Sequence, residues 1–476
     1  MNLDSDQCYR ALLSHDARFD GRFFVGVRTT RIYCRPVCTV KPPLAKNCRY
    51  FQSAAAAEIE GFRPCLRCRP ELAPGFAAVD ANRRLAQSAA RLIDDGKLQE
   101  SSLEDLAAHL AVTDRHLRRV FQQEFGVSPV EYAQTQRLLL AKRLLTDTDM
   151  TVLDAALASG FASLRRFNDL FRKRYRMTPG ELRKTGERKR PTDRLSFDLA
   201  YRPPYDWPST LAFLAKRAIA GVETVDDKRY RRTLRAGKLA GWIEVAPAPK
   251  RDALRVTVSA SLSTAIPGVL SRVKALFDLA CNPVEITEAL GPLAKANPGL
   301  RLPGAVDGFE IAVRAILGQQ VTVKAAITIA GRFVNAFGDV HETPHAGLTR
   351  LFPKPAAIAT LTQDDVAKHG IIATRARAII ELARALVEDR LSLEPTAEVE
   401  ATLAALEAIP GVGPWTAQYI AMRALAWPDA FPHPDVAVLK AMRHDKPRDA
   451  LANAEAWRPW RAYAVLHLWK SLEKTP

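Results

Sequence analysis

The sequence has neither a long hydrophobic run nor a hydrophobic start. None of its apolar stretches approaches the ~20 residues that a membrane-spanning helix needs. Residues 1–6 are polar and acidic, unlike a secretory signal peptide. Cysteine is scarce as well, with 7 in 476 residues. We therefore expect a cytoplasmic protein with no membrane contact and no disulfide framework, whose cysteines serve metal or thiol chemistry.

Acidic residues are fewer than basic ones. The chain has 69 Lys and Arg against 52 Asp and Glu, a net charge of +17, of which residues 1–190 carry +11. The densest basic runs are 172–176 and 188–190. Such runs are typical of nucleic-acid binding, although a solvated surface is the alternative. Binding to a membrane surface is less favoured, because no basic amphipathic helix with exposed aromatics is evident.

The length predicts about three or four domains, and the composition changes along the chain accordingly. Residues 1–80 hold six of the seven cysteines, and residues 83–184 have a helical pattern. Residues 185–195, charged and punctuated by Gly and Pro, indicate a linker. Residues 196–283 include alternating segments typical of strands, and residues 284–476 return to helical periodicity. We expect a multidomain α+β protein.

The helical part contains an internal repeat. Residues 103–121 and 152–171 each combine a short apolar-faced helix, a tight turn and a second helix with paired arginines, and residues 130–145 would connect them. This is the helix-turn-helix plan, in which the second helix enters the major groove of DNA. An ordinary helical bundle is the alternative, disfavoured by the duplication and the arginines. The candidate groove-facing residues are Arg115, Arg118, Arg119, Arg165, Arg166 and Asn168.

Four cysteines form two close pairs, Cys34 with Cys38 and Cys65 with Cys68. Two such pairs separated by a loop predict a tetrahedral Zn²⁺ site with four thiolate ligands, whereas four buried free cysteines would give no reason for the pairing. Thiolates in such a site keep some nucleophilicity. We interpret the other cysteines as structural thiols: Cys8, Cys48 and Cys281. Nearby arginines that could bind DNA phosphates are Arg22, Arg28, Arg31, Arg35, Arg63, Arg67 and Arg69.

Residues 8–72 resemble the N-terminal domain of the Ada family of DNA-repair methyltransferases, most clearly over 24–36 and 61–68. The resemblance implies that Cys34 accepts a methyl group from a methylphosphotriester in DNA, and that the less negative site then binds DNA more tightly. Residues 83–184 continue it as an AraC-type activator domain, with promoter DNA and RNA polymerase as candidate partners. Two DNA-binding units in one chain fit a monomer. The Pro-Cys-His-Arg motif of the alkylguanine-repairing Ada domain is absent, so that activity is not expected.

The C-terminal part contains the pattern of a helix-hairpin-helix. Gly411 and Gly413 stand in its hairpin, where the lack of a side chain lets backbone amides approach a DNA phosphate. About twenty residues later, a Pro-rich turn precedes Asp435. This order resembles the helix-hairpin-helix DNA glycosylases, and several strings between residues 199 and 470 resemble the AlkA family of 3-methyladenine glycosylases.

The AlkA resemblance implies that the enzyme flips an alkylated nucleotide out of the duplex into an aromatic pocket. The matching positions are Trp415, Tyr419 and Trp469, whose rings would attract a cationic base. Judged from the residues alone, core packing would be the favoured role for these three. The family inserts a Leu into the DNA gap as a wedge, and the matching position here is Gln320.

Asp435 is the expected catalytic carboxylate. Its charge can stabilise the oxocarbenium-like sugar, and it can orient or deprotonate the attacking water. A helix N-cap is the structural alternative for an Asp in this context, and both roles are compatible. Bifunctional members of the superfamily carry a Lys two residues after the second hairpin glycine, where this chain has Trp415. We therefore expect a monofunctional hydrolase that leaves an abasic site.

Together these resemblances imply four domains. They are a small zinc α/β domain (1–80), an all-α double helix-turn-helix domain (83–184), an antiparallel-sheet α+β domain (196–283) and an all-α glycosylase domain (284–476). The expected function is a fusion of alkylation sensor, transcriptional activator and DNA glycosylase acting on double-stranded DNA. Two alternatives stay open: a regulator whose glycosylase part only binds DNA, and a repair enzyme whose N-terminal half only anchors it.

Overall fold

The computed structural model describes residues 5–16, 19–73, 81–148, 150–184 and 194–473. The chain divides into two compact units. The first is Met1–Pro203 with Ala248–Arg272 and Leu279–Cys281, and the second is Pro204–Pro247, Val273–Asp278 and Asn282–Pro476. Most of the expected linker, residues 185–193, lies outside the described residues, while Arg194 and Leu195 already belong to a strand.

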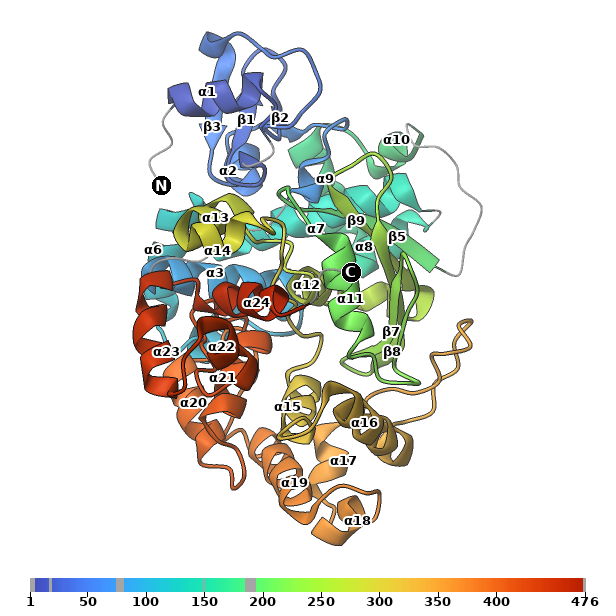
Figure 1. Cartoon of the computed structure of the whole chain (residues 1–476). Coiled ribbons are helices and arrows are strands. Elements are labelled where there is room, and N and C mark those ends of the chain that lie inside the picture. The colour runs from blue at the N-terminus through green and yellow to red at the C-terminus, as the bar shows by residue number, and fades with distance from the viewer. Residues whose placement is uncertain (1–4, 17–18, 74–80, 149, 185–193, 474–476) are drawn as a thin grey trace. The chain divides into compact units, whose positions relative to one another are not determined.

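The first unit begins with a small four-stranded sheet in the order β3-β1-β2-β4. Strand β1 pairs antiparallel with β2 and β3, while β2 pairs parallel with β4. Helices α1 and α2 lie next to this sheet (Figure 1). At Gly26 in β1, a Cβ atom would lie 2.6 Å from the Phe51 ring, so only glycine fits there. The bounds are α1 (Ser5–Leu13), β1 (Phe24–Val27), β2 (Ile32–Cys34), β3 (Cys48–Phe51), α2 (Ala54–Ile59) and β4 (Arg63–Pro64).

Helices form the next part of the first unit, and the expected repeat is present. Helices α5 and α6 form the first pair, α8 and α9 the second, and α7 connects them. Each recognition helix begins after a hydroxyl N-cap: Thr113 accepts from His116 N, and Ser163 accepts from Arg166 N. The bounds are α3 (Ala81–Asp94), α4 (Lys97–Glu100), α5 (Leu103–His109), α6 (Asp114–Phe125), α7 (Pro129–Asp147), α8 (Val152–Ala158), α9 (Leu164–Tyr175) and α10 (Pro179–Lys184).

Antiparallel strands follow, as the alternating segments predicted. Strands β5 (Arg194–Ala200) and β9 (Ala253–Ser259) pair within the first unit. In the second unit β7 pairs with both β6 and β8. The bounds are β6 (Glu223–Val225), β7 (Tyr230–Ala236) and β8 (Leu239–Pro247). Helix α12 (Ile266–Leu276) begins in the first unit and ends in the second.

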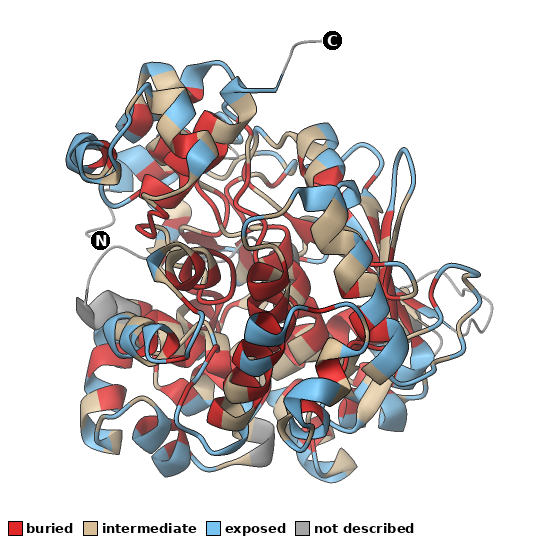
Figure 2. Ribbon diagram, turned by 60° about the horizontal axis from the view of Figure 1, so that its bottom comes forward, coloured by how far each residue is buried: buried red, intermediate tan, exposed pale blue. Residues whose placement is uncertain are grey.

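The rest of the second unit is helical, with α15 as its most buried helix. Eight of its ten residues are buried, and most helices expose one face and bury the other (Figure 2). The bounds are α11 (Trp207–Ala215), α13 (Pro283–Leu290), α14 (Pro292–Lys295), α15 (Gly308–Leu317), α16 (Val323–Phe337), α17 (Pro355–Ala359), α18 (Gln363–Ala367), α19 (Ala373–Val387), α20 (Val399–Glu407), α21 (Pro414–Arg423), α22 (Val436–Met442), α23 (Pro447–Ala454) and α24 (Arg461–Ser471).

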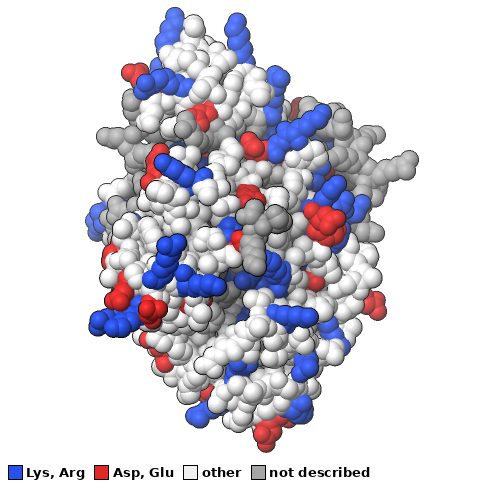
Figure 3. All heavy atoms as spheres, viewed as in Figure 1, with Lys and Arg blue, Asp and Glu red and all other residues white. Residues whose placement is uncertain are grey.

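The surface agrees with the basic composition. Lys and Arg side chains are spread over the face in view, with acidic groups among them, rather than gathered in one continuous patch (Figure 3). Within the described part of the chain, no helix is both long and apolar enough to cross a membrane.

Candidate functional site

The four paired cysteines converge on one point. Their Sγ atoms all lie within 4.8 Å of one another, and four sulfurs about 2.3 Å from a Zn²⁺ ion would be separated by about 3.8 Å. Hydrogen bonding among the crowded thiols, above all with Cys38, raises the pKa of Cys34. The donor set therefore fits one metal ion. Cys34 is 5% exposed, and Cys68 is the most exposed of the four.

The remaining cysteines lie elsewhere, as expected. Cys8 and Cys48 share a separate apolar cluster, and Cys281 is buried in the interior.

Two of the arginines expected to bind phosphate form ion pairs within the fold. Arg35 is buried and forms an ion pair with Asp20, and its backbone N–H donates to Cys68 Sγ at 3.3 Å. Arg69 pairs with Glu71 and Asp147. To contact DNA, Arg35 would have to leave Asp20, and Arg69 would have to leave its two carboxylates, so a phosphate-binding role for these two stays a prediction. Among the arginines expected to bind phosphate, Arg28, Arg31 and Arg67 are exposed.

The cysteine-bearing part packs tightly on the helices of the same unit. The buried carboxylate of Glu58 in α2 accepts from Tyr33 Oη at 2.9 Å and from Thr135 Oγ1 of α7 at 3.2 Å. Burial raises the pKa of Glu58 to about 7. Ser53 Oγ donates to the Phe125 carbonyl at the end of α6, at 2.8 Å. Nothing in the local sequence pattern around Glu58 indicated these contacts.

The candidate groove-facing residues lie on the second helix of each pair. In α6, Arg115, Arg118 and Arg119 are exposed, and Arg118 forms an ion pair with Asp114 one turn earlier, at 2.9 Å. In α9, Arg165 and Arg166 are exposed, while Asn168 is half-buried. Arg118 would have to leave Asp114 in order to bind DNA.

A cavity of about 410 Å³ in the second unit brings together Asp435, Trp415, Tyr419 and Trp469. Asp435 caps α22, because its Oδ1 accepts from Val438 N at 2.9 Å. Both indoles also donate to this carboxylate, Trp415 Nε1 to Oδ2 at 2.8 Å and Trp469 Nε1 to Oδ1 at 3.1 Å. The carboxylate is thus held by three N–H donors at the wall of the cavity.

The aromatic residues form a continuous lining. Trp415 and Tyr419, one turn apart on α21, stack with ring centroids 5.4 Å apart and an interplanar angle of 15°. Tyr419 and Trp469 are 6.4 Å apart. Arg423 donates to Tyr419 Oη at 2.8 Å. Burial opposes ionisation of the Tyr419 phenol, but the guanidinium groups of Arg423, Arg217 and Arg314 outweigh burial and lower its pKa.

The hairpin between α20 and α21 lies against the loop that carries Gln320. Gly411 adopts φ = 91°, a left-handed conformation that favours glycine, whereas a Cβ on Gly413 would meet nothing within 4 Å. Gln319 Nε2 donates to the Gly411 carbonyl at 2.8 Å and to Thr416 Oγ1 at 2.9 Å. Gln320 itself is exposed, with φ = 54°. The sequence did not indicate that Gln319 joins these two loops.

Comparisons with known proteins relate four parts of the chain to known families. Four family models match: the metal binding domain of Ada (7–71), a helix-turn-helix domain (106–185), the AlkA N-terminal domain (196–307) and the HhH-GPD superfamily of base excision DNA repair proteins (313–461). A probable bifunctional transcriptional activator/DNA repair enzyme AlkA of Mycobacterium tuberculosis is 40% identical over 489 residues, covering 99% of this chain and 97% of that protein. The chain belongs to this AlkA family of bifunctional activators and repair enzymes.

Each half of the family architecture also has relatives of its own. DNA-3-methyladenine glycosylase 2 of Escherichia coli is 39% identical over 274 residues, covering 57% of this chain and 96% of that protein. The bifunctional transcriptional activator/DNA repair enzyme AdaA of Bacillus subtilis is 32% identical over 181 residues, covering 38% of this chain and 82% of that protein. The expected combination of metal-binding, helix-turn-helix, sheet and helix-hairpin-helix parts is confirmed for this AlkA-family chain.

Proposed function

We propose that this chain both repairs alkylated DNA and reports the damage. Its C-terminal half hydrolyses the N-glycosidic bond of alkylated bases of the 3-methyladenine type. Its N-terminal half takes a methyl group from a DNA methylphosphotriester onto Cys34 and then activates transcription. The observation that carries the enzymatic part is the carboxylate of Asp435, held by two indole N–H groups in the aromatic cavity.

The cavity suits a base that has been flipped out of the duplex. In hydrolysis, water attacks C1′ of the sugar, the C1′–N bond breaks, and its electron pair leaves with the cationic base, which becomes neutral. The attacking water releases one proton to solvent. Positive charge builds on the sugar as the bond breaks, so the fixed charge of Asp435 lowers the barrier. A carboxylate has about four lone-pair sites, and three are occupied by Val438, Trp415 and Trp469. The remaining site can orient one water molecule, which favours an electrostatic and positioning role.

We propose that the enzyme is monofunctional and leaves an abasic site. Lyase chemistry needs an amine that attacks C1′, and none of the residues described as lining the cavity is a lysine. The position two residues after Gly413 is Trp415, whose indole N–H is engaged by Asp435. Borohydride should therefore trap no covalent adduct with damaged DNA, and an adduct on a lysine of the second unit would refute monofunctional chemistry.

The decisive variant is Asp435→Asn, because Asn caps a helix about as well as Asp does. Excision of 3-methyladenine from methylated duplex should slow by about a hundred- to a thousandfold, the usual loss for one electrostatic group. Asp206→Asn is the matched control, since Asp206 caps α11 by accepting from Ser209 N and lines neither cavity described here. Unchanged excision in Asp435→Asn would refute the assignment.

In the N-terminal half, the Cys34 sulfur would attack the methyl carbon while the carbon–oxygen bond of the phosphotriester breaks, leaving a phosphodiester and a thioether. The metal ion held by Cys34, Cys38, Cys65 and Cys68 would supply the charge that keeps these sulfurs as thiolates. Peptide mass spectrometry after incubation with methylated DNA should place one methyl group on Cys34. Methylation of Cys68, the most exposed of the four, in place of Cys34 would overturn the assignment.

Activation requires DNA binding by the two helix-turn-helix pairs. We propose that the exposed arginines of α6 and α9 contact promoter DNA, that Gln320 is the wedge, and that the chain acts as a monomer with RNA polymerase as its partner. The domain limits 1–80, 83–184, 196–283 and 284–476 belong to this proposal, as does a cytoplasmic location, where thiols stay reduced. Promoter affinity measured before and after methylation tests the sensor, and equal affinities would leave only an anchoring role.

A further inference from the structure

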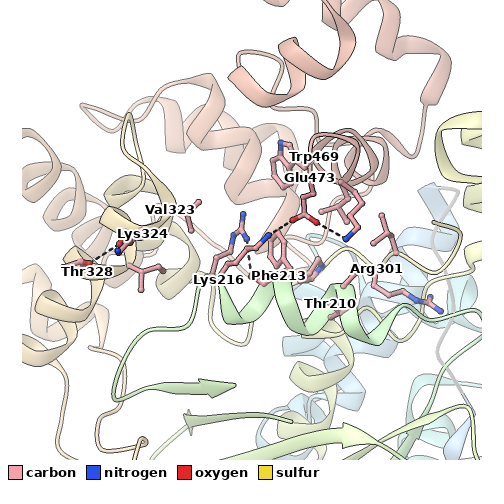
Figure 4. A pocket seen from close by; sticks show the side chains of 16 residues that line it. Thr210, Phe213, Lys216, Arg301, Val323, Lys324, Thr328, Trp469 and Glu473 are labelled. Carbon is pink, nitrogen blue, oxygen red and sulfur yellow. Dashed lines mark hydrogen bonds and ion pairs between the residues drawn. The ribbon is translucent and has the colours of Figure 1, made fainter. Parts of the chain in front are cut away.

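A second cavity, of about 560 Å³, adjoins the base pocket in the second unit (Figure 4). The two cavities share lining residues, so they are neighbouring parts of one depression. The sugar and phosphates of a nucleotide whose base occupies the pocket must leave it in some direction, and this cavity offers one. The shared residues are Arg217, Val323, Ile327, Trp469 and Glu473.

This cavity combines an apolar floor with a basic rim. Phe213, Leu300 and Leu466 contribute apolar surface, and the Arg217 guanidinium lies 3.7 Å from the centroid of the Phe213 ring. Around them are basic side chains, and Figure 4 shows Lys324 and Arg301 at opposite ends. Among the lining residues described, Glu473 is the only acid, so the cavity carries a net positive charge. The basic lining residues are Lys216, Arg217, Arg301, Lys324 and Lys470.

Glu473 bridges two of these lysines. Its Oε1 accepts from Lys216 Nζ at 2.6 Å, and its Oε2 accepts from Lys470 Nζ at 2.9 Å. The bond from Lys216 is the main cause of a lowered pKa at Glu473. All three side chains are partly exposed, at 58% for Lys216, 31% for Lys470 and 45% for Glu473. Such an exposed pair contributes little to stability, so an incoming anion can exchange with the carboxylate.

We propose that this cavity receives the backbone of the damaged strand beside the flipped nucleotide, with one phosphate taking the place of Glu473 between Lys216 and Lys470. A phosphate presents two oxygens to two ammonium groups, as the carboxylate does. The sugar of the flipped nucleotide stays beside Asp435 where the two cavities meet, because Trp469 lines both and donates to this carboxylate. Glu473 is the counter-ion that is displaced. The site deepens the proposed glycosylase function, because its position follows from a base in the adjoining pocket.

The first test needs no catalysis. The full chain is labelled at its lysines by an amine-reactive reagent, with and without a duplex that carries a stable abasic analogue, and the labels are located by mass spectrometry. Lys216 and Lys470 should be protected by DNA. Lys368 is the control, because it is also an exposed lysine in an ion pair, with Asp365 on α18, and lines neither cavity described here. Equal labelling of Lys216 and Lys470 with and without DNA would overturn the site.

The second test uses excision kinetics over a range of salt concentrations. Lys216→Met and Lys470→Met should each raise KM severalfold and reduce the slope of log KM against log salt by about one, with kcat changed far less. Glu473→Gln should lower KM, because the competing anion is gone, whereas Lys368→Met should behave like wild type. If excision depends on Asp435 but the lysine variants match the control, the site is wrong and the glycosylase assignment stands. Absence of excision by the wild type would contradict the proposed function alone, since the labelling test is independent of it.

Discussion

Glu58 provides the sharpest test of how the metal-binding part is joined to the helices. The residue is 2% exposed, and burial raises the pKa of its carboxyl from 4.5 to about 7. The folded chain therefore holds this proton up to about pH 7, whereas the unfolded chain releases it near pH 4.5. The free energy of unfolding falls as the pH rises across this window, by about 3 kcal/mol at roughly 1.4 kcal/mol per pH unit.

Replacing the acid by its neutral isostere should remove that loss. Glu58→Gln can still accept from Tyr33, and its amide can face Thr135 Oγ1. We expect the variant to be more stable than wild type by about 2 kcal/mol at about pH 6 and by about 3 kcal/mol at about pH 8. This pH dependence is the distinguishing feature, because a merely altered packing contact would shift stability equally at both values.

The assay must follow the first unit by itself. All seven tryptophans lie between residues 207 and 469, so tryptophan fluorescence reports on the second unit and serves as an internal control. Hydrogen exchange of peptides from α7 reports on the contact with Glu58. Glu60→Gln is the matched variant, since Glu60 is 43% exposed and pairs with Arg49. A Glu58→Gln protein less stable than wild type at both pH values would refute the reasoning.

Three further predictions concern the two sites. Trp469→Phe keeps an aromatic ring but removes one donor to Asp435, so single-turnover excision should slow by about ten- to a hundredfold, as expected for a hydrogen bond to a charged group; an unchanged rate would contradict a supporting role for the indole. Cys38→Ser should abolish binding of the one metal ion, measured by a chromogenic zinc assay, and retention of stoichiometric zinc would exclude this ligand set. Gly411→Ala should destabilise the hairpin by about 1–2 kcal/mol because of the left-handed backbone at this position, and it should raise KM for excision. Gly413→Ala should leave the hairpin intact, because a Cβ there has open space around it. Equal effects of the two variants on thermal stability would show that backbone strain is not the cause.

Elements with strong local signals could be predicted closely from the sequence. The connecting helix was expected over 130–145 and spans Pro129–Asp147, and both recognition helices begin directly after a hydroxyl residue that caps them. The paired spacing of Cys34 with Cys38 and Cys65 with Cys68 was enough to predict that they converge. The helices and their caps depend on residues near one another in the chain. Two close pairs of cysteines have one common use, which is to bind a metal ion.

The contacts that complete the sites join distant residues and leave no local pattern. Gln319 reaches the Gly411 carbonyl across 92 positions, and Thr135 reaches Glu58 across 77. The indole of Trp469 finds Asp435 across 34 positions. An ionic side chain such as Arg35 can bind phosphate or a buried carboxylate, and only the fold decides which partner is nearer. Positive charge near the cysteines therefore does not by itself show which arginines are free to bind DNA.

The packing of the cysteine-bearing part on α7 limits where the chain can be divided into fragments. Leu139 of α7 lies in one apolar cluster with Phe24 and Tyr33 of the small sheet and with Phe62, which precedes β4. Ala55 of α2 lies in the cluster of the helices. A fragment ending near residue 80 would leave that apolar surface uncovered and the Glu58 carboxylate without Thr135. The cysteine-bearing part therefore depends on α7 for its packing. A fusion of the cysteine-bearing part to another activator would have to include α7. A new regulator built from it would need both parts.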